Sequence, residues 1–506
     1  MSERRVTFLI FISLLLAYVY VLPRWLDWNQ NTRFDLTMAL VERGVLYIDD
    51  YVGNTGDYAE YSGHVYSDKA PGLSFLAAPA YALARWLIAS DVAHALLIQL
   101  GRNPSAALTV NRPIEQVSAA EFAQAARVTL VTGWIVALPA ALFGAGLYRF
   151  LARLALAPRA RAWAVLAYGL ATVIAPYSAT LYGHVIATVL LFSAWAWLVI
   201  RRSHGASPLE YLAIGSLLGF AVITEYPSVL IAALIFLYAA ATQRPWKRLG
   251  WIIAGGVWPL ALLGLYNKAI FGSPFTLTYE YVGNVRLRQL LQTGLLSAGW
   301  PRLDAAWGLT FSPFRGLFFM SPILLLAVAG FVFTARDRSH RPEWWSSLSI
   351  VMAFTLLVTG SAQWWGGWSV GPRYLIPMLP WLIWPLGAAI DWLTKRRWGL
   401  GVLITLIAAS CLSTWLQALG GQYYAPDDIA APLFEYSWPH ILAGDVARNW
   451  GMIAGLRGGL SVLPLVVLIV CAFSVTWFAT RPTGTPPQSQ LLITQDTHSL
   501  EGVTRP

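Results

Sequence analysis

The chain has 506 residues, of which 57% are hydrophobic and 12% charged, and its mean hydropathy is +0.56. Soluble domains carry about 25% charged residues, so this composition excludes a soluble or disordered protein and predicts a polytopic membrane protein. The formal net charge of +10 would indicate nucleic acid in a soluble protein, but membrane topology accounts for it here and no nucleic-acid partner is expected.

Apolar runs of roughly membrane-spanning length follow one another along the chain. They cover residues 6–23, 127–148, 162–179, 185–200, 209–224, 228–242, 249–267, 317–334, 345–361, 374–391, 399–418 and 460–479. The first run lacks a small-residue cleavage site, so we expect an uncleaved anchor rather than a removable signal. Runs of this length are typical of helices, because membrane strands alternate over about ten residues. The predicted fold is an all-α polytopic membrane protein with about twelve transmembrane helices, forming a single domain over residues 1–480.

Basic clusters stand after every second apolar run, as loops on the cytoplasmic side should. They are Arg149/Arg153/Arg159/Arg161, Arg201/Arg202, Arg244/Lys247/Arg248, Arg336/Arg338/Arg341 and Lys395/Arg396/Arg397. We therefore expect a multi-pass protein of the plasma (inner) membrane with both termini in the cytoplasm. The tail 481–506 is rich in Thr, Pro, Gln and Ser, and is predicted to be disordered.

Three long segments are expected on the opposite, extracytoplasmic side: residues 24–126, 268–316 and 419–459. The first carries 11 of the 25 carboxylates of the chain. Within it, residues 71–100 are apolar enough to resemble a span, but a full crossing would reverse the side of every later basic loop. We therefore expect 71–126 to remain outside, as a re-entrant or juxtamembrane helical segment.

Asp35 is the first candidate for a catalytic residue. It lies in a stretch where Phe34, Met38 and Val41 would share one helical face, which predicts an amphipathic helix on the membrane surface. A carboxylate that is partly desolvated there could act as a general base. The alternative is a charge placed near a helix N-terminus, where the helix dipole favours it.

The segment from Tyr61 to Gly72 brings His64, Asp68 and Lys69 to the entrance of the expected re-entrant helix. An ammonium beside a helix start can hold a phosphate with the help of free backbone N–H groups. The alternative is an interfacial Asp–Lys pair that contributes less than about 1 kcal/mol to stability.

Later external turns supply further candidates for substrate binding. They are His184 in Tyr-Gly-His, Glu225 in Glu-Tyr-Pro, Arg315 in Ser-Pro-Phe-Arg-Gly, and Trp365, Arg373 and Tyr374 in Trp-Trp-Gly-Gly-Trp-Ser-Val-Gly-Pro-Arg-Tyr. The guanidinium fork matches phosphate, although an arginine above a span can also simply snorkel to the interface. The tryptophans could stack on a sugar or mark the aromatic belt of the membrane.

Taken together, these residues favour a catalytic site at the outer interface that is supplied with a lipid-linked substrate. An ion-coupled transporter would need ionisable groups at mid-membrane or broken helices, and neither is evident in the sequence.

The layout resembles the GT-C superfamily of membrane glycosyltransferases, in particular the bacterial relatives of protein O-mannosyltransferases and aminoarabinose transferases (family 39-like). The resemblance covers most of residues 1–420 and rests on the 31–44 helix, the Tyr66–Pro71 segment, the Ser312–Gly316 turn and the Trp365–Tyr374 loop. It implies many spans and a long first external loop that bears an essential carboxylate, followed by juxtamembrane helices. In such enzymes an Asp-Glu pair usually lies a set number of residues before the glycine that closes the first loop helix. Counting back from Gly44 arrives at Gln30, so Asp35, or else Asp68 or another loop carboxylate, has to take this role.

The resemblance implies a glycosyltransferase that moves a sugar from a polyprenyl-phosphate carrier to an acceptor hydroxyl on the extracytoplasmic face, with inversion. Asp35 would be the base. Lys69, Arg315 and Arg373 would stabilise the departing phosphate, with His184, Tyr374 and Trp365 as sugar or headgroup contacts. The acceptor is left open between lipid, glycan and protein. No metal ligand is assigned, although the many external carboxylates leave a divalent metal open. The alternatives are a translocator of lipid-linked sugars or polysaccharide, and a non-catalytic envelope-assembly protein.

Overall fold

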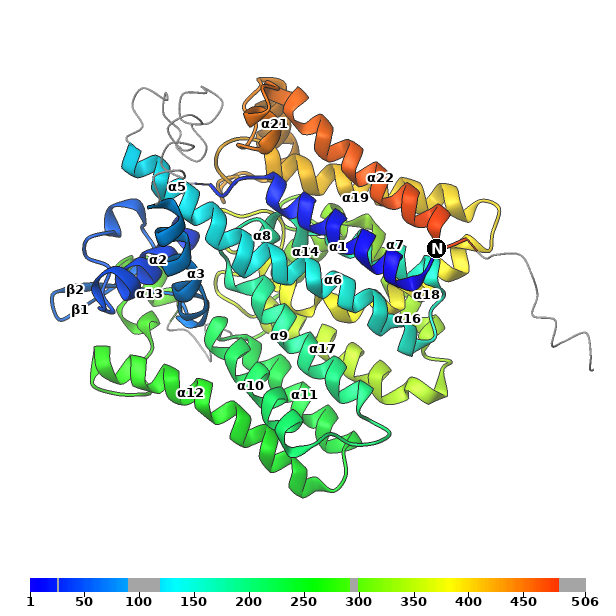
Figure 1. Ribbon diagram of the computed structural model, residues 1–506, viewed down its shortest axis with the longest axis horizontal. Helices are drawn as coiled ribbons and strands as arrows, with labels where there is room; N and C mark the ends of the chain where they lie inside the picture. Colours follow the sequence, from blue (N-terminus) through cyan, green and yellow to red (C-terminus); the bar gives the residue numbers. More distant parts are fainter. Residues whose placement is uncertain (25–26, 90–118, 292–298, 482–506) are drawn as a thin grey trace, which may run out of the picture.

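The computed structural model describes residues 1–24, 27–89, 119–291 and 299–481. Most of the long helices run side by side across Figure 1, so the described molecule has two ends. The N-terminus lies at one end. At the other lie α2 (Trp28–Met38), α3 (Gly72–Ile88) and a hairpin of β1 (Tyr58–Tyr61) and β2 (His64–Ser67).

Each of the twelve apolar runs coincides with one helix or with a broken series of helices. In chain order these are α1 (Glu3–Tyr20); α5 (Ala119–Thr132), η5 (Gly133–Ala137) and α6 (Leu138–Phe150); α7 (Pro158–Leu170) and α8 (Ile174–Ser178); α9 (Gly183–Ile200); α10 (Pro208–Thr224); α11 (Ser228–Thr242); α12 (Leu249–Phe271); α15 (Leu317–Met320), η9 (Pro322–Leu324) and α16 (Leu325–Thr334); α17 (Arg341–Thr359); η11 (Arg373–Leu382) and α18 (Ile383–Thr394); α19 (Gly399–Leu419); and η13 (Gly458–Val462) with α22 (Leu463–Ala479).

Among the described residues, six helical segments are long and apolar enough to cross a membrane, and four shorter apolar helices, α3 among them, accompany these. The prediction of an all-α polytopic membrane protein is therefore confirmed, while the number of twelve spans stays a prediction. Shorter elements connect the long helices. They are η1 (Ala39–Arg43), η2 (Val52–Asn54), η6 (Leu151–Leu154), η7 (Trp246–Arg248), η8 (Thr278–Tyr281), α13 (Val285–Leu291), α14 (Leu303–Thr310), η10 (Arg338–His340), η12 (Leu433–Ser437), α20 (Trp438–Leu442) and α21 (Trp450–Ile453). The predicted disorder of the tail falls on residues 482–506, which lie outside the described residues.

The basic loops meet at the end of the molecule where the chain begins. Several contacts join them to one another and to the two terminal helices: Met1 N to Ala479 O at 3.0 Å, Arg161 Nη1 to Glu3 Oε1 at 2.8 Å, His340 Nε2 to Arg153 O at 3.1 Å and Arg202 Nη1 to Glu343 Oε2 at 2.6 Å. The clusters after every second run thus share one end, as alternating helix directions require. The side of the membrane that this end faces stays a prediction.

Helix α2 lies inside the protein rather than on a membrane surface, so the expectation of a surface amphipathic helix is wrong. Every residue from Asn29 to Met38 is buried. Phe34 packs edge-on against Tyr81 of α3, with ring centroids 5.3 Å apart, and Ser74 Oγ donates to Arg33 O at 2.9 Å. The apolar face of α2 is therefore covered by α3, where lipid had been expected.

Helix α3 is amphipathic and extends over 17 residues, about 25 Å, which is shorter than a full span. Its buried positions, Leu73, Ala77, Tyr81, Ala84 and Ile88, recur every three or four residues, as one helical face requires. The opposite face exposes Trp86 and Leu83. Figure 1 shows α3 beside α2, at the end of the bundle away from the N-terminus.

The hairpin positions two acidic residues side by side. Tyr58 pairs with Ser67 and Tyr61 with His64 in antiparallel register. The turn between the strands, Ser62-Gly63, has positive φ at both residues (50° and 83°), which suits the twist of a two-residue hairpin. Because Tyr58 and Ser67 close the ladder, the residues just beyond them, Asp57 and Asp68, are neighbours in space.

Candidate active site

Asp27 is the N-cap of α2, and one of its two carboxylate oxygens has no hydrogen-bond partner. Its Oδ1 accepts from the backbone N–H of Gln30 at 3.4 Å and from the hydroxyl of Tyr182 at 2.8 Å. Its Oδ2 is buried and accepts no hydrogen bond. Burial raises the pKa of the Asp27 carboxyl above its ordinary value, against the opposing effects of Tyr182, Arg373, Gln30 and Arg24. A buried carboxylate with a raised pKa and a free oxygen is suited to accept a proton.

Arg373, at the start of η11, faces the same region as Asp27. Its guanidinium carbon lies 5.2 Å from the ring centroids of both Tyr182 and Tyr374. Its Nε is buried and has no hydrogen-bond partner. Gly366 makes room for this side chain: it has a φ of 78°, and a Cβ there would lie 2.9 Å from Arg373 Nε. The Gly-Gly of the Trp365–Tyr374 loop therefore serves a close approach of backbone to guanidinium.

Arg315 binds the backbone of that loop. Its guanidinium donates to the carbonyl oxygens of Trp365 at 3.3 Å, Gly367 at 3.0 Å and Phe314 at 3.2 Å. Only 1% of the residue is exposed, and burial lowers its pKa to about 10. The indole N–H of Trp365 donates to Asp427 Oδ2 at 2.9 Å, which ties the loop to the segment after α19. Arg315 and Trp365 are thus joined to one another and shape the loop that ends in Arg373.

A buried ion pair links α2 to the ends of α9 and α10. Arg33 Nη2 donates to Glu225 Oε1 at 2.7 Å, and His184 Nδ1 lies 3.6 Å from the same oxygen. The His184 ring is perpendicular to that of Tyr374, with centroids 5.7 Å apart. The structure therefore brings four of the residues predicted from separate turns into one group, namely His184, Glu225, Arg373 and Tyr374.

Lys69 lies between the two acidic residues at the open end of the hairpin. Its Nζ is 2.8 Å from Asp68 Oδ2 and 2.9 Å from Asp57 Oδ2. Burial raises the pKa of the Asp68 carboxyl, although Lys69 opposes this. Burial disfavours the charged form of Lys69, but the two carboxylates outweigh it and hold the pKa of the ammonium above its usual value. Arg33 connects this triad to the ion pair above, because its Nη1 donates to Ala70 O at 3.2 Å.

Two predicted residues lie apart from this group. Asp35 is fully buried on α2, where its Oδ1 accepts from Asn54 Nδ2 at 3.1 Å, and burial raises its pKa well above the ordinary value. His64 is exposed near the hairpin turn, where its Nδ1 lies 2.6 Å from Asp49 Oδ2 and its ring stacks on Tyr47. Neither residue is brought to Arg373 or Arg315 by a hydrogen bond or ion pair in the described part of the chain.

The sequence did not single out Asp27, Tyr182 or Arg33. A signal for Asp27 was present, because it is the first carboxylate after the first apolar run and the GT-C resemblance places an essential carboxylate there. Tyr182 stands two residues before the predicted His184. Arg33 gave no signal, since its partner Glu225 is 192 residues away.

No group of three or more His, Cys, Asp or Glu side chains that could hold a metal ion occurs among the described residues. The carboxylates of Asp57 and Asp68 resemble part of a metal site, but both bind the ammonium of Lys69.

Comparisons with known proteins show a structural likeness and no match by sequence. No protein-family model matches the chain, and no curated protein matches it. Among solved structures it is similar to ArnT from Cupriavidus metallidurans in the apo state, with 18% sequence identity and a TM-score of 0.48. The match covers 93% of this chain and 73% of that chain. A likeness of this degree carries no argument about activity, so the function has to be inferred from the side chains.

Proposed function

We propose that the protein is a membrane glycosyltransferase that transfers a sugar from a polyprenyl-phosphate carrier to an acceptor hydroxyl, at the end of the bundle that carries α2 and α3. One observation supports this most strongly. Asp27 Oδ2 and Arg373 Nε are both buried, both lack a hydrogen-bond partner, and both adjoin Tyr182. A substrate hydroxyl could donate to Asp27 Oδ2, and a phosphate could accept from Arg373 Nε, so that both buried groups would gain a hydrogen bond.

In the proposed reaction Asp27 Oδ2 accepts the proton of the acceptor hydroxyl while that oxygen bonds to the anomeric carbon. The bond from the anomeric carbon to the phosphate oxygen breaks on the opposite face, and the electron pair leaves with the lipid phosphate. Arg373 stabilises the negative charge that grows on this leaving group. Attack from the opposite face inverts the anomeric carbon.

The other residues have supporting parts in this proposal. Lys69 uses two of its three N–H donors on Asp57 and Asp68, which leaves one for another acceptor. Its positive charge would also attract the phosphate. Arg315 and Trp365 hold the loop that positions Arg373. His184, with Glu225 and Tyr374, lines the sugar side. We assign Asp35 a structural part, in contrast to the expectation from the sequence, because its hydrogen bond is to Asn54 and it is not joined to either arginine in the described residues.

The test is reconstitution with a panel of radiolabelled polyprenyl-phosphate sugars, in membranes that carry endogenous lipid and glycan acceptors. We expect a new glycosidic product with the wild-type protein and none with Asp27→Asn or Arg373→Ala. Movement of labelled lipid across the bilayer without any glycosidic product would instead support the translocator.

A further inference from the structure

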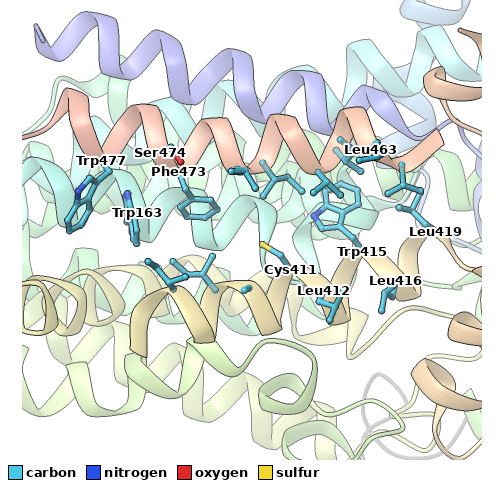
Figure 2. Close-up of a pocket in the computed structure, with 18 of the residues that line it drawn as sticks. Trp163, Cys411, Leu412, Trp415, Leu416, Leu419, Leu463, Phe473, Ser474 and Trp477 are labelled. Carbon is cyan, nitrogen blue, oxygen red and sulfur yellow. The ribbon is translucent and has the colours of Figure 1, made fainter. Parts of the chain in front are cut away.

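A long apolar groove runs between α19 and α22. Its volume is about 660 Å³, and Figure 2 shows side chains of both helices facing it, with Trp163 of α7 at one end. On α22 the lining extends from Leu463 to Phe478, which corresponds to about 22 Å of helix. α19 packs mainly on η9, α18 and η12, and α22 on α1 and α7, so neither helix fills the space between them.

The length of the groove favours hydrocarbon as its ligand. The lining is made almost entirely of aliphatic and aromatic carbon. Two of the polar groups along it, Trp415 Nε1 and Cys411 Sγ, both donate to Leu170 O and are therefore already satisfied. An acyl chain fits such a surface, whereas a polar ligand would lose its hydrogen bonds along it.

Two arginines cover the end of the groove that lies where the chain begins. Trp477 and Phe478 line the groove in the last turn of α22, which ends near the N-terminus in Figure 1. The guanidinium carbon of Arg159, at the start of α7, lies 3.9 Å from the ring centroid of Trp477. That of Arg481 lies 4.4 Å from the ring centroid of Phe478. Both cations are therefore in direct contact with side chains that line the groove.

Two buried N–H donors at this end have no hydrogen-bond partner among the described residues, namely Arg159 Nε and Trp163 Nε1. Trp163 lines the groove, is 5% exposed, and has its ring centroid 4.9 Å from that of Trp477. Burial lowers the pKa of Arg159, the charge of Arg481 lowers it further, and no described carboxylate opposes them. An anionic ligand with hydrogen-bond acceptors would complete both donors and balance the charge.

We propose that this groove binds an anionic glycerophospholipid, with its phosphate on Arg159 and Arg481, an ester carbonyl at Trp163 Nε1 and its acyl chains between α19 and α22. The headgroup distinguishes this ligand from a zwitterionic lipid, because two guanidinium groups attract a phosphate and repel an ammonium. The position of the headgroup distinguishes it from the sugar donor, whose phosphate belongs at the opposite, α2 end of the bundle. The proposal is therefore independent of the proposed function.

The experiment measures lipid binding to the delipidated full chain in detergent by native mass spectrometry. Phosphatidylglycerol and phosphatidylethanolamine with identical acyl chains are titrated separately, and the first is then challenged with inorganic phosphate and with polyprenyl phosphate. We expect one phosphatidylglycerol per chain, bound about tenfold more tightly than phosphatidylethanolamine. Inorganic phosphate lacks the acyl chains and should not displace it. Polyprenyl phosphate lacks the ester carbonyl and the second chain, so it should compete about tenfold less well than phosphatidylglycerol itself.

Two pairs of matched variants test the headgroup and the acyl chains separately. Arg159→Gln removes the cation on Trp477, whereas Arg149→Gln removes an exposed arginine from the same end of the molecule. Ser474→Trp fills the groove, whereas the exposed neighbour Val475 does not line it, so Val475→Trp only adds surface. We expect Arg159→Gln and Ser474→Trp each to weaken phosphatidylglycerol binding about tenfold, and the two controls to bind as the wild-type protein does.

Thermal unfolding separates loss of the site from loss of the fold. Phosphatidylglycerol should raise the unfolding midpoint of the wild-type protein and of both controls, but not that of Arg159→Gln or Ser474→Trp. Equal binding of phosphatidylethanolamine, an equal loss of affinity in Arg149→Gln, or displacement by inorganic phosphate would overturn the proposal. Preferential binding of polyprenyl phosphate would also overturn it and assign the groove to the sugar donor. None of these measurements requires sugar transfer, so they leave the test of the proposed function separate.

Discussion

Replacing Asp27 with asparagine should abolish transfer while leaving the fold intact. The amide oxygen of asparagine can still accept from Tyr182 and from the Gln30 N–H, and asparagine caps helices about as well as aspartate. What disappears is the ability to take a proton. General bases contribute about 10²–10⁴-fold to rate, so we expect kcat/KM to fall by that factor, equivalent to roughly 3–5 kcal/mol of transition-state stabilisation.

Asp35→Asn is the matched control for this experiment. Both positions are buried carboxylates of the same helix segment, and both have a raised pKa. Asp35 Oδ1 accepts from Asn54, and Asp35 Oδ2, like Asp27 Oδ2, is buried without a hydrogen-bond partner; however, no arginine acts on the pKa of Asp35. We expect Asp35→Asn to retain transfer within about threefold, well below the effect of losing a general base. The assay is product formation from radiolabelled polyprenyl-phosphate sugar in proteoliposomes. The reverse pattern, with Asp35→Asn inactive and Asp27→Asn active, would refute the reasoning and restore the expectation from the sequence.

The remaining predictions concern pH, the phosphate contact and the buried triad. Because burial raises the pKa of Asp27, its carboxyl remains protonated, and therefore inactive as a base, up to a higher pH than an ordinary aspartate. The acid limb of the pH profile of kcat/KM should therefore have a pKa above the ordinary aspartate value of about 3.9. A pKa at or below that value would contradict this. Arg373→Ala should lower kcat/KM by about 10²-fold or more. Arg373→Lys should be intermediate, because the charge remains but the forked geometry of the guanidinium is lost. Equal activity of the wild-type protein and both variants would show that Arg373 is not part of the site. Lys69→Met leaves Asp57 and Asp68 facing each other without a cation. The free energy of unfolding, followed by thermal unfolding in detergent, should fall by about 3–5 kcal/mol, with Lys69→Arg as the control that keeps the charge. An unchanged midpoint would show that Lys69 does not stabilise the two carboxylates.

The arrangement of helices could be predicted because it depends on local properties of the chain. Apolar length determines where a helix can cross a bilayer, and basic clusters after every second run determine which helix ends lie together. The contact of Met1 with Ala479 follows from that alternation. The hairpin was missed for a local reason. Its strands, Tyr58–Tyr61 and His64–Ser67, are only four residues long, too short for an alternating pattern to stand out in a long loop.

The position of α2 could not be predicted, because its apolar face meets α3 and not lipid. Phe34 and Met38 have the same spacing in either case, and only tertiary packing decides which surface covers them. A polar α2 with a buried Arg33 is compatible with the interior because Glu225, far along the chain, neutralises it.

The candidate site was predicted in part. The individual turns with His184, Glu225 and Arg373 stood out because ionisable residues at the ends of apolar runs are unusual. Their roles did not follow from the turns alone. Arg315 resembled a phosphate ligand in the sequence, but its donors are directed at the carbonyls of Trp365 and Gly367, a use that depends on loop geometry. Asp27 stands first after the first apolar run, but nothing in its sequence neighbourhood shows that Tyr182 and Arg373 surround it.

The most direct test of the central claim is an experimental structure with polyprenyl phosphate bound. The account predicts that the phosphate contacts the Arg373 guanidinium and that Asp27 Oδ2 faces the space beside it. A phosphate bound among the basic loops near Met1, or at the hairpin turn near His64, would contradict it.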